Sequence, residues 1–208
     1  MERRDFLKKS ALAAAALAVA ATVPSAVSAM AKDNIKNNKN MKKILILNGS
    51  PRKNGKTASL VNAFSEGARS VGNEVREMYI PGMKIGGCLA CESCSRSKDG
   101  CVQHDDMDTI YEAYEWADVL VLASPMFWGS VSGQLKTAVD RLYGIQNKLG
   151  YGNHQREMVF IMTARGNYYE DALDFYHIFT QIMGWPDLGT ILGAGKETEA
   201  RALGASIK

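Results

Sequence analysis

A loop rich in hydrogen-bond donors and cations follows the first strongly apolar run of the chain, residues 44–47. A short apolar run of this kind predicts a strand buried within a parallel sheet. The loop has the sequence NGSPRKNGK over residues 48–56, and a helical pattern begins at Thr57. Free N–H groups at the start of a helix, together with the helix dipole, bind anions. This order of strand, polar loop and helix predicts a phosphate cradle, to which Arg52, Lys53 and Lys56 add positive charge.

The spacing of the glycines argues against the two common nucleotide loops. The ATPase-type loop has four residues between its glycines, whereas five separate Gly49 from Gly55. The later strand 118–125 also carries no acidic residue at its far end to hold magnesium. The dinucleotide fingerprint needs a glycine where this chain has Pro51. The phosphate of flavin mononucleotide (FMN) fits better, and an ordinary strand-to-helix turn is the alternative.

A second loop, residues 125–130 with the sequence PMFWGS, could hold the ring of the same cofactor. An isoalloxazine ring is a flat, mostly apolar plate with a rim of hydrogen-bonding atoms. It is held by backbone N–H groups and by apolar or aromatic side chains. Phe127 and Trp128 beside Gly129 supply these features. The alternative is that both aromatic side chains cover the core.

Alternating strands and helices are predicted to position these loops. Strands are expected at 44–47, 73–80, 118–124, 157–163 and 188–192, and helices at 57–71, 105–114, 131–142, 172–183 and 197–207. Five strands alternating with helices predict an α/β fold with a doubly wound parallel sheet. The loops that follow strands 44–47, 118–124 and 157–163 then meet at the carboxyl edge of the sheet, where such folds bind ligands. Asp105, Asp106 and Asp108 could be mistaken for a metal site, but we expect them to cap the second helix.

Residues 1–31 have the composition of a secretory signal peptide, with a charged start, an apolar run over 11–23 and small residues after it. Arg3 and Arg4 resemble the twin-arginine type, which carries folded proteins to the periplasm. The apolar run is too short to span a bilayer. Residues 32–40 are polar and predict a flexible linker to a domain over 41–208. An internal start at Met41, giving a cytoplasmic protein, is the alternative.

The charge of the chain excludes one class of partner. The whole sequence carries +3, of which residues 1–31 contribute +2, so the remainder is near +1. A remainder so close to neutral gives no basis for binding nucleic acid or a membrane surface.

The two loops, the cysteine-rich segment between them and the sequence SPMFWGSVSGQLKTAVDR resemble the flavodoxin-like NAD(P)H-dependent FMN reductase family. The resemblance extends over about residues 42–165. It implies a sheet in the order 2-1-3-4-5 with helices on both faces, bound FMN, NAD(P)H as electron donor, and homodimers or higher homo-oligomers that complete the flavin pocket. By position, the phosphate would be held by Ser50, Arg52, Asn54, Gly55, Lys56 and Thr57; the ring by Pro125, Met126, Phe127, Trp128 and Gly129; and its other side by Thr163, Arg165 and Gly166.

All the cysteines of the chain, Cys88, Cys91, Cys94 and Cys101, fall in one short segment. Their spacing resembles the compact motif of the iron–sulfur flavoproteins, a branch of the same family, and so implies a [4Fe–4S] cluster near FMN. Three closely spaced cysteines can cover one face of a cubane that a fourth closes. The segment leaves the second predicted strand, so we expect it near the flavin edge. A zinc site, disulfides, or a metal-free loop that shapes the substrate side are the alternatives.

We expect an exported FMN-dependent oxidoreductase in which the flavin carries the electrons and the protein supplies position and electrostatics. No catalytic side chain is predicted, and His104, His154 and His177 are scattered. An exported enzyme would not meet NAD(P)H, so a membrane quinol, a cytochrome or another protein could be the donor. The acceptor could be a quinone, a nitro or azo compound, a metal ion or a protein.

Two other functions belong to different classes. A flavodoxin-type electron carrier is the first, but such carriers are usually strongly acidic, whereas this domain is near +1. A binding module that has kept the fold without flavin is the second. The two intact loops argue against it.

Overall fold

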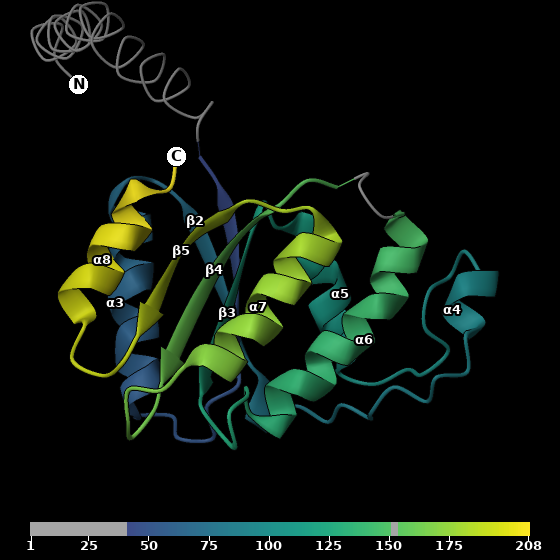
Figure 1. The fold of residues 1–208 in the computed structure, drawn as a ribbon. Helices are drawn as coiled ribbons and strands as arrows, with labels where there is room; N and C mark the ends of the chain where they lie inside the picture. The colour runs from purple at the N-terminus through teal and green to yellow at the C-terminus, as the bar shows by residue number, and fades with distance from the viewer. Residues whose placement is uncertain (1–40, 151–153) are drawn as a thin grey trace, which may run out of the picture. The chain divides into compact units, whose positions relative to one another are not determined.

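The computed structural model describes residues 41–150 and 154–208 as a sheet covered by helices on both faces (Figure 1). The five strands are all parallel and lie in the order β2-β1-β3-β4-β5, which confirms the predicted flavodoxin-like topology. The strands are β1 (Lys43–Asn48), β2 (Glu74–Tyr79), β3 (Val119–Pro125), β4 (Glu157–Thr163) and β5 (Asp187–Leu192). Because all the strands are parallel, the loops that follow β1, β3 and β4 lie together at one edge of the sheet, the edge to which the arrowheads of β4 and β5 point in Figure 1.

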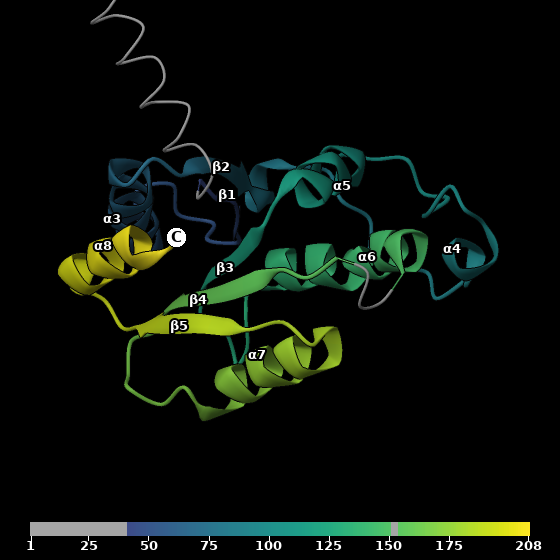
Figure 2. The same ribbon diagram turned by 90° about the horizontal axis from the view of Figure 1, so that it is seen from above.

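Helices of unequal length connect the strands. They are α3 (Lys56–Ser70), α4 (Ser93–Arg96), α5 (Met107–Trp116), α6 (Gly133–Leu149), α7 (Glu170–Met183) and α8 (Glu197–Ser206), with a 3₁₀ turn η2 (Ile80–Gly82). Figure 2 shows α3 and α8 on one side of the sheet and α5, α6 and α7 on the other. Within the described ranges, none of these helices combines the length and the hydropathy needed to cross a bilayer.

The central strands are buried on both faces because alternate residues enter two different cores. Leu45 and Leu47 pack in the cluster that includes the buried side chains of α5, α6 and α7. Ile44 and Ile46 pack in the cluster with α3 and α8. The continuous apolar run at the start of the domain is therefore a two-sided core strand, as predicted.

Three details differ from the sequence predictions or lie beyond them. The first helix was predicted to extend to residue 71, but α3 ends at Ser70, and Val71 is a 48% exposed C-cap residue. The short helix α4 was not predicted, because four residues cannot show a helical repeat of apolar positions. The predicted signal peptide and linker, residues 1–31 and 32–40, lie outside the described residues.

Candidate functional site

A cavity of about 360 Å³ lies where the loops after β1, β3 and β4 meet at the carboxyl edge of the sheet. The predicted cofactor residues that line it are Ser50, Arg52, Gly55, Lys56, Thr57, Pro125, Met126, Phe127, Thr163 and Arg165. Three segments that are distant in sequence therefore form one site, as the parallel topology requires.

The remaining predicted cofactor residues lie elsewhere. Trp128, Gly129 and Gly166 line a second cavity of about 450 Å³, and Met126 and Arg165 line both cavities. Asn54 lines neither. The sequence analysis also missed six residues that line these cavities, Pro51, Ala164, Asn167, Tyr168, Asp171 and Ala194. The two glycines that flank Ala194 after β5 were the available signal of a loop at this edge.

Buried hydrogen bonds hold the loop after β1 in place. The Asn48 Oδ1 atom accepts from the backbone N–H of Ser50 at 3.0 Å, and the Gly49 N–H donates to the Ala123 carbonyl at 2.8 Å. The Ser50 Oγ atom accepts from the Arg52 N–H at 3.3 Å. Asn48 and Ser50 are buried, so their polar groups depend on these partners. The loop is therefore a preformed wall of the cavity.

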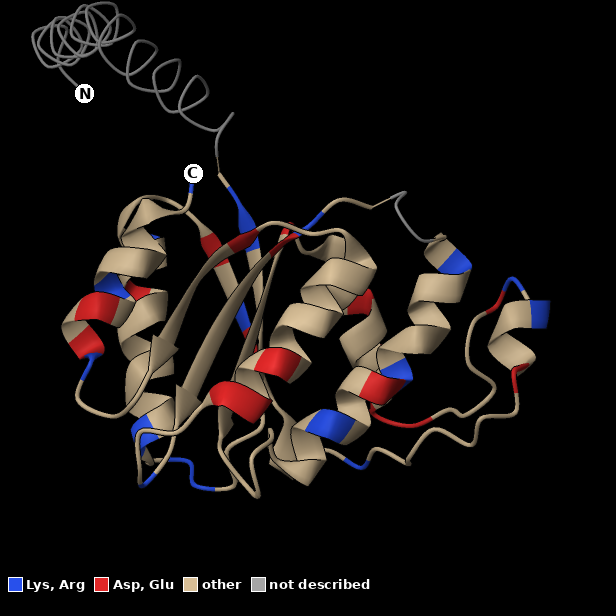
Figure 3. Ribbon diagram, in the orientation of Figure 1, with Lys and Arg blue, Asp and Glu red and all other residues tan. Residues whose placement is uncertain are grey.

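The first turn of α3 faces the cavity with donors and positive charge. Gly55 is the N-cap residue, so no side chain caps the helix, and no acidic residue lies in its first turn. Free N–H groups at such a terminus favour an anion. Arg52 and Lys56 line the same cavity, and Figure 3 shows basic segments in the loop that enters α3. The Thr57 Oγ1 atom lies 2.7 Å from the Thr163 Oγ1 atom and so joins this loop to the loop after β4. These features fit a phosphate group.

The aromatic loop after β3 has a strained backbone. Phe127 and Ser130 exchange backbone hydrogen bonds of 2.9 and 3.1 Å, which forces a tight turn between them. Trp128 adopts a φ of +51°, a conformation that non-glycine residues rarely occupy, and Gly129 follows at +75°. Phe127 is 46% exposed and Trp128 is fully exposed, so neither covers the core. Both aromatic side chains are available at the cavities, as a ring-binding loop requires.

The four cysteines line a third cavity of about 250 Å³. Cys88 and Cys91 are exposed, Cys94 and Cys101 are partly buried, and none of the four is in a disulfide. The Asn147 side chain of α6 donates to the Cys94 sulfur at 3.4 Å. Within the described residues, no three His, Cys, Asp or Glu side chains are close enough to hold a single metal ion. A [4Fe–4S] cubane binds one thiolate at each of its four irons, so its four ligands lie farther apart than the ligands of a single metal ion.

The cysteine cavity lies along α6 and not at the flavin edge. It shares no lining residue with the 360 Å³ cavity. Its α6 residues, Asp140 to Gly144, follow the first residue of the helix, Gly133, by 7 to 11 positions, or about 10–17 Å along the axis. Arg141 causes this placement, because it donates to the carbonyls of Gly86 and Gln103 at 2.8 and 3.1 Å and so fastens both ends of the segment to α6.

The predicted capping of α5 by the aspartates is confirmed only in part, because the N-cap residue, Asp106, forms no side-chain capping hydrogen bond. The Asp105 carboxylate accepts from the N–H groups of Met107 and Gly86 at 3.0 and 2.9 Å. Asp106 accepts from the Lys84 N–H at 2.7 Å. Asp105 also forms an ion pair with Arg141 at 2.8 Å that the sequence analysis did not foresee.

The Asp105 pair gives a prediction about acid stability. Burial alone would raise the pKa of Asp105, but hydrogen bonds from Arg141 and from backbone N–H groups outweigh it and hold the pKa below 3.8. A carboxyl group whose pKa is lower in the folded state stabilises the fold fully at pH values above its unfolded-state pKa. This stabilisation is lost as the pH falls through its folded-state pKa. Wild type should therefore lose more free energy of unfolding than Asp105→Asn as pH falls below 3.8. Urea denaturation at several pH values measures this, and parallel curves would contradict it.

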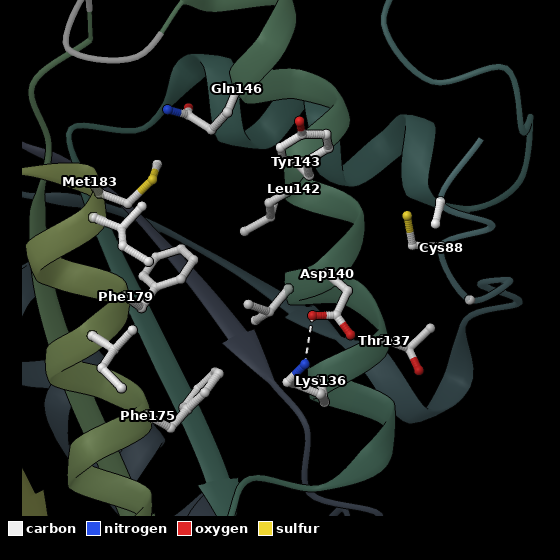
Figure 4. A pocket seen from close by; sticks show the side chains of 15 residues that line it. Cys88, Lys136, Thr137, Asp140, Leu142, Tyr143, Gln146, Phe175, Phe179 and Met183 are labelled. Atoms are coloured by element: carbon white, nitrogen blue, oxygen red, sulfur yellow. Dashed lines mark hydrogen bonds and ion pairs between the residues drawn. The ribbon is translucent and has the colours of Figure 1, made fainter. Parts of the chain in front are cut away.

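An apolar groove of about 740 Å³ separates α6 from α7 (Figure 4). Phe175, Phe179 and Met183 line it from α7, and Leu142 and Tyr143 from α6. The groove continues into the cysteine cavity, since both are lined by Cys88, Ala90, Asp140 and Tyr143. The sequence analysis predicted the helix at 172–183 but did not predict this groove.

Curated proteins resemble part of the chain. An iron–sulfur flavoprotein of Methanocaldococcus jannaschii is 40% identical over 106 residues, which cover 51% of this chain and 53% of that protein. One from Methanosarcina thermophila is 36% identical over 115 residues, covering 52% of this chain and 60% of that protein. The chain thus spans about half the length of the curated relatives it matches.

Solved structures share the fold at low identity. The NAD(P)H:quinone oxidoreductase from Methanothermobacter marburgensis has a TM-score of 0.63 at 18% identity, covering 81% of this chain and 96% of that chain. An FMN-dependent NADH-azoreductase from Bacillus anthracis, solved in complex with FMN, has a TM-score of 0.54 at 15% identity, covering 79% and 94%. Residues 42–198 match the family model described as NADPH-dependent FMN reductase. The chain therefore belongs to the NADPH-dependent FMN reductase family.

Proposed function

We propose that this protein is an FMN-dependent oxidoreductase that passes electrons to a quinone, another small molecule or a protein. The observation that carries the proposal is the 360 Å³ cavity in which the phosphate-type loop, the aromatic loop and the loop after β4 converge. Family membership and the FMN-bound azoreductase with the same fold support it.

The residues present fit FMN at both ends. The uncapped first turn of α3, with Ser50 and Thr57, would bind the phosphate, and Arg52 and Lys56 would balance its charge. The segments 125–129 and 163–166 would orient the ring and exclude water from one side. FMN supplies the redox chemistry when bound, so no acid or base from the protein is required.

We also propose that the four cysteines hold a [4Fe–4S] cluster, which would supply one-electron chemistry. Three observations support this: all four thiols line one cavity, none is in a disulfide, and the similar archaeal proteins are named iron–sulfur flavoproteins. The cavity is roomy and is open at Cys88 and Cys91, so a cluster could be inserted after folding.

An absorption spectrum of protein purified without air, together with iron and sulfide assays, tests both proposals. Flavin bands, a broad shoulder that dithionite bleaches, and about four irons per chain are expected. Flavin bands without iron would overturn the cluster proposal alone. Protein without flavin, even after incubation with FMN, would overturn the oxidoreductase proposal.

We infer from residues 1–31 that the protein is exported by the twin-arginine route, so that its donor is a quinol, a cytochrome or a protein. A cytoplasmic form starting at Met41 would instead use NAD(P)H. In a bacterial host, wild type should appear in the periplasm, and Arg3→Lys with Arg4→Lys should be retained in the cytoplasm. Equal distribution of the two would contradict export by this route. Anaerobic mixing with NADPH then tests the donor through the loss of flavin absorbance.

We propose that a second copy of the chain covers the groove between α6 and α7, because the exposed rim of the groove is apolar. Ile178 and Ile182 are 56% and 65% exposed there, and apolar patches of this kind mark interaction sites. Changing both to glutamate should convert a dimer to a monomer by light scattering. Val71→Glu is the control, since Val71 is similarly exposed at the C-terminal end of α3. An unchanged mass for the double variant would overturn the interface.

A further inference from the structure

We propose that Arg141 sets the charge environment of the four-cysteine site. Its guanidinium holds the two ends of the cysteine segment together and places a buried positive charge beside the cavity that the four thiols line. The inference rests on the proposed [4Fe–4S] cluster. It concerns a residue to which the sequence analysis assigned no role.

The guanidinium is almost completely buried, at 1% exposure, and binds both ends of the segment. Its Nη1 donates to the Gly86 carbonyl at 2.8 Å, and its Nη2 donates to the Gln103 carbonyl at 3.1 Å. The same two nitrogens donate to the Asp105 carboxylate at 2.8 and 3.3 Å. Residues 86 and 103 flank all four cysteines. Arg141 therefore holds the two ends of the cysteine segment together.

The Nε–H group of Arg141 is buried and has no hydrogen-bond partner, although both terminal nitrogens are paired. An unsatisfied buried donor is costly, more so when it is charged. Arg141 lines the same cavity as the four cysteines. An anion in that cavity would offset part of this cost, because its negative charge would lie close to the buried guanidinium.

Cys101 lies against the helix that carries this charge. A Cβ on Gly144, one helical turn after Arg141, would lie 3.1 Å from the Cys101 Cβ, so this cysteine packs directly on α6. Burial alone would lower the pKa of Arg141, but the Asp105 carboxylate, Tyr111 and Cys101 outweigh it and raise the pKa above its usual value. The guanidinium therefore carries its charge at neutral pH.

Substitutions at Arg141 and at Asp105 are expected to shift the reduction potential of the cluster in opposite directions. Arg141→Gln removes the positive charge and leaves the carboxylate, so adding an electron to the cluster becomes less favourable. Asp105→Asn removes the carboxylate and leaves the positive charge, so adding an electron becomes more favourable. A structural loosening that only admits water would move both variants in the same direction. The sign of the two shifts thus separates a charge role from a structural one.

The experiment is an anaerobic redox titration of the cluster-loaded proteins, followed by electron paramagnetic resonance, with iron content and thermal midpoint measured on the same samples. At the wild-type midpoint, the ratio of reduced to oxidised cluster should fall at least tenfold in Arg141→Gln and rise at least tenfold in Asp105→Asn. A tenfold change is about 59 mV for one electron. Arg141→Lys should have a reduction potential close to that of wild type, because it keeps the positive charge. It should hold less iron, because lysine lacks the planar guanidinium whose two terminal nitrogens bind both ends of the segment.

Arg156→Gln is the matched control. Arg156 is buried and donates to the carbonyls of Ala117 and Tyr114 at 3.1 and 2.7 Å, but it does not line the cysteine cavity. This variant should lose thermal stability without a shift in potential.

Shifts of the same sign in the Arg141→Gln and Asp105→Asn variants, or no shift, would overturn the inference while leaving the cluster proposal intact. If the Arg141→Gln variant binds no iron, the Asp105→Asn variant tests the inference alone. A reduction potential of Asp105→Asn at or below that of wild type would then overturn the inference. Loss of iron in every Arg141 and Asp105 variant, with iron retained in Arg156→Gln, would reduce Arg141 to a structural anchor. Wild-type protein without iron would overturn the cluster proposal, and this inference with it.

Discussion

Changing both Arg52 and Lys56 to glutamate should weaken FMN binding by about 100-fold, or about 2.7 kcal/mol. Both side chains line the cavity at the uncapped start of α3, where they would balance the phosphate charge. Hydrogen bonds and ion pairs to a charged group are each worth about 1.5–3 kcal/mol. Reversal also places two carboxylates near the phosphate. Titration of flavin fluorescence with flavin-free protein measures the change.

Riboflavin and Lys53 are the controls for this prediction. Riboflavin lacks the phosphate, so its affinity should be the same in the double variant and in wild type. Lys53→Glu makes the same charge change in the same loop, but Lys53 does not line the cavity and its Nζ lies 5.4 Å from the Tyr79 ring centroid. The Lys53→Glu variant should bind FMN less than threefold more weakly than wild type. Equal losses for FMN and riboflavin would show that the two side chains do not bind the phosphate.

Changing Gly49 to alanine should lower the free energy of unfolding by about 1–3 kcal/mol and weaken FMN binding together with it. A Cβ at Gly49 would lie 2.5 Å from the Leu135 Cβ and 2.7 Å from the Ser132 Oγ, both near the start of α6. The loop would have to move away from the helix, which would break the 2.7 Å hydrogen bond that the Ser132 hydroxyl donates to the Gly49 carbonyl. The cavity wall would move with it.

Gly133→Ala is the matched control, because a Cβ at Gly133 has no neighbour within 4 Å and alanine is the better helix former. It should leave stability equal or higher, and leave FMN binding unchanged. Urea denaturation and the same flavin titration compare the two variants. A Gly49→Ala protein as stable as wild type would show that the loop can move at little cost.

The cofactor site shows how far local sequence carries a prediction. The phosphate-type loop and the aromatic loop were recognised from residues 48–57 and 125–130 alone, because a strand, a polar loop and a helix start follow each other without interruption. That the two loops meet follows from the parallel topology, which the order of strands and helices determines. Whether Asn54 lines the cavity depends on how one short loop folds, and no periodic pattern encodes that.

The cysteine segment shows the limit of such prediction. Its cysteines could be recognised from spacing, but their place against α6 depends on Arg141, which lies 40 positions after Cys101. Nothing in a helix sequence reveals whether an arginine faces solvent or is buried against the carbonyls of another segment. Composition likewise could not separate the apolar residues of α7 that fill the core from those that line the open groove.

The sequence by itself determined the order of strands and helices, the edge at which the loops gather and the residue types at the cofactor site, because periodicity and turn chemistry are local. Only the tertiary structure decided which side chains share a cavity, that the cysteine cavity is separate from the 360 Å³ cavity proposed for FMN, and that an Arg141–Asp105 pair lies beside the cysteines. These depend on contacts between segments far apart in the chain, which form only when the whole sheet and its helices pack together.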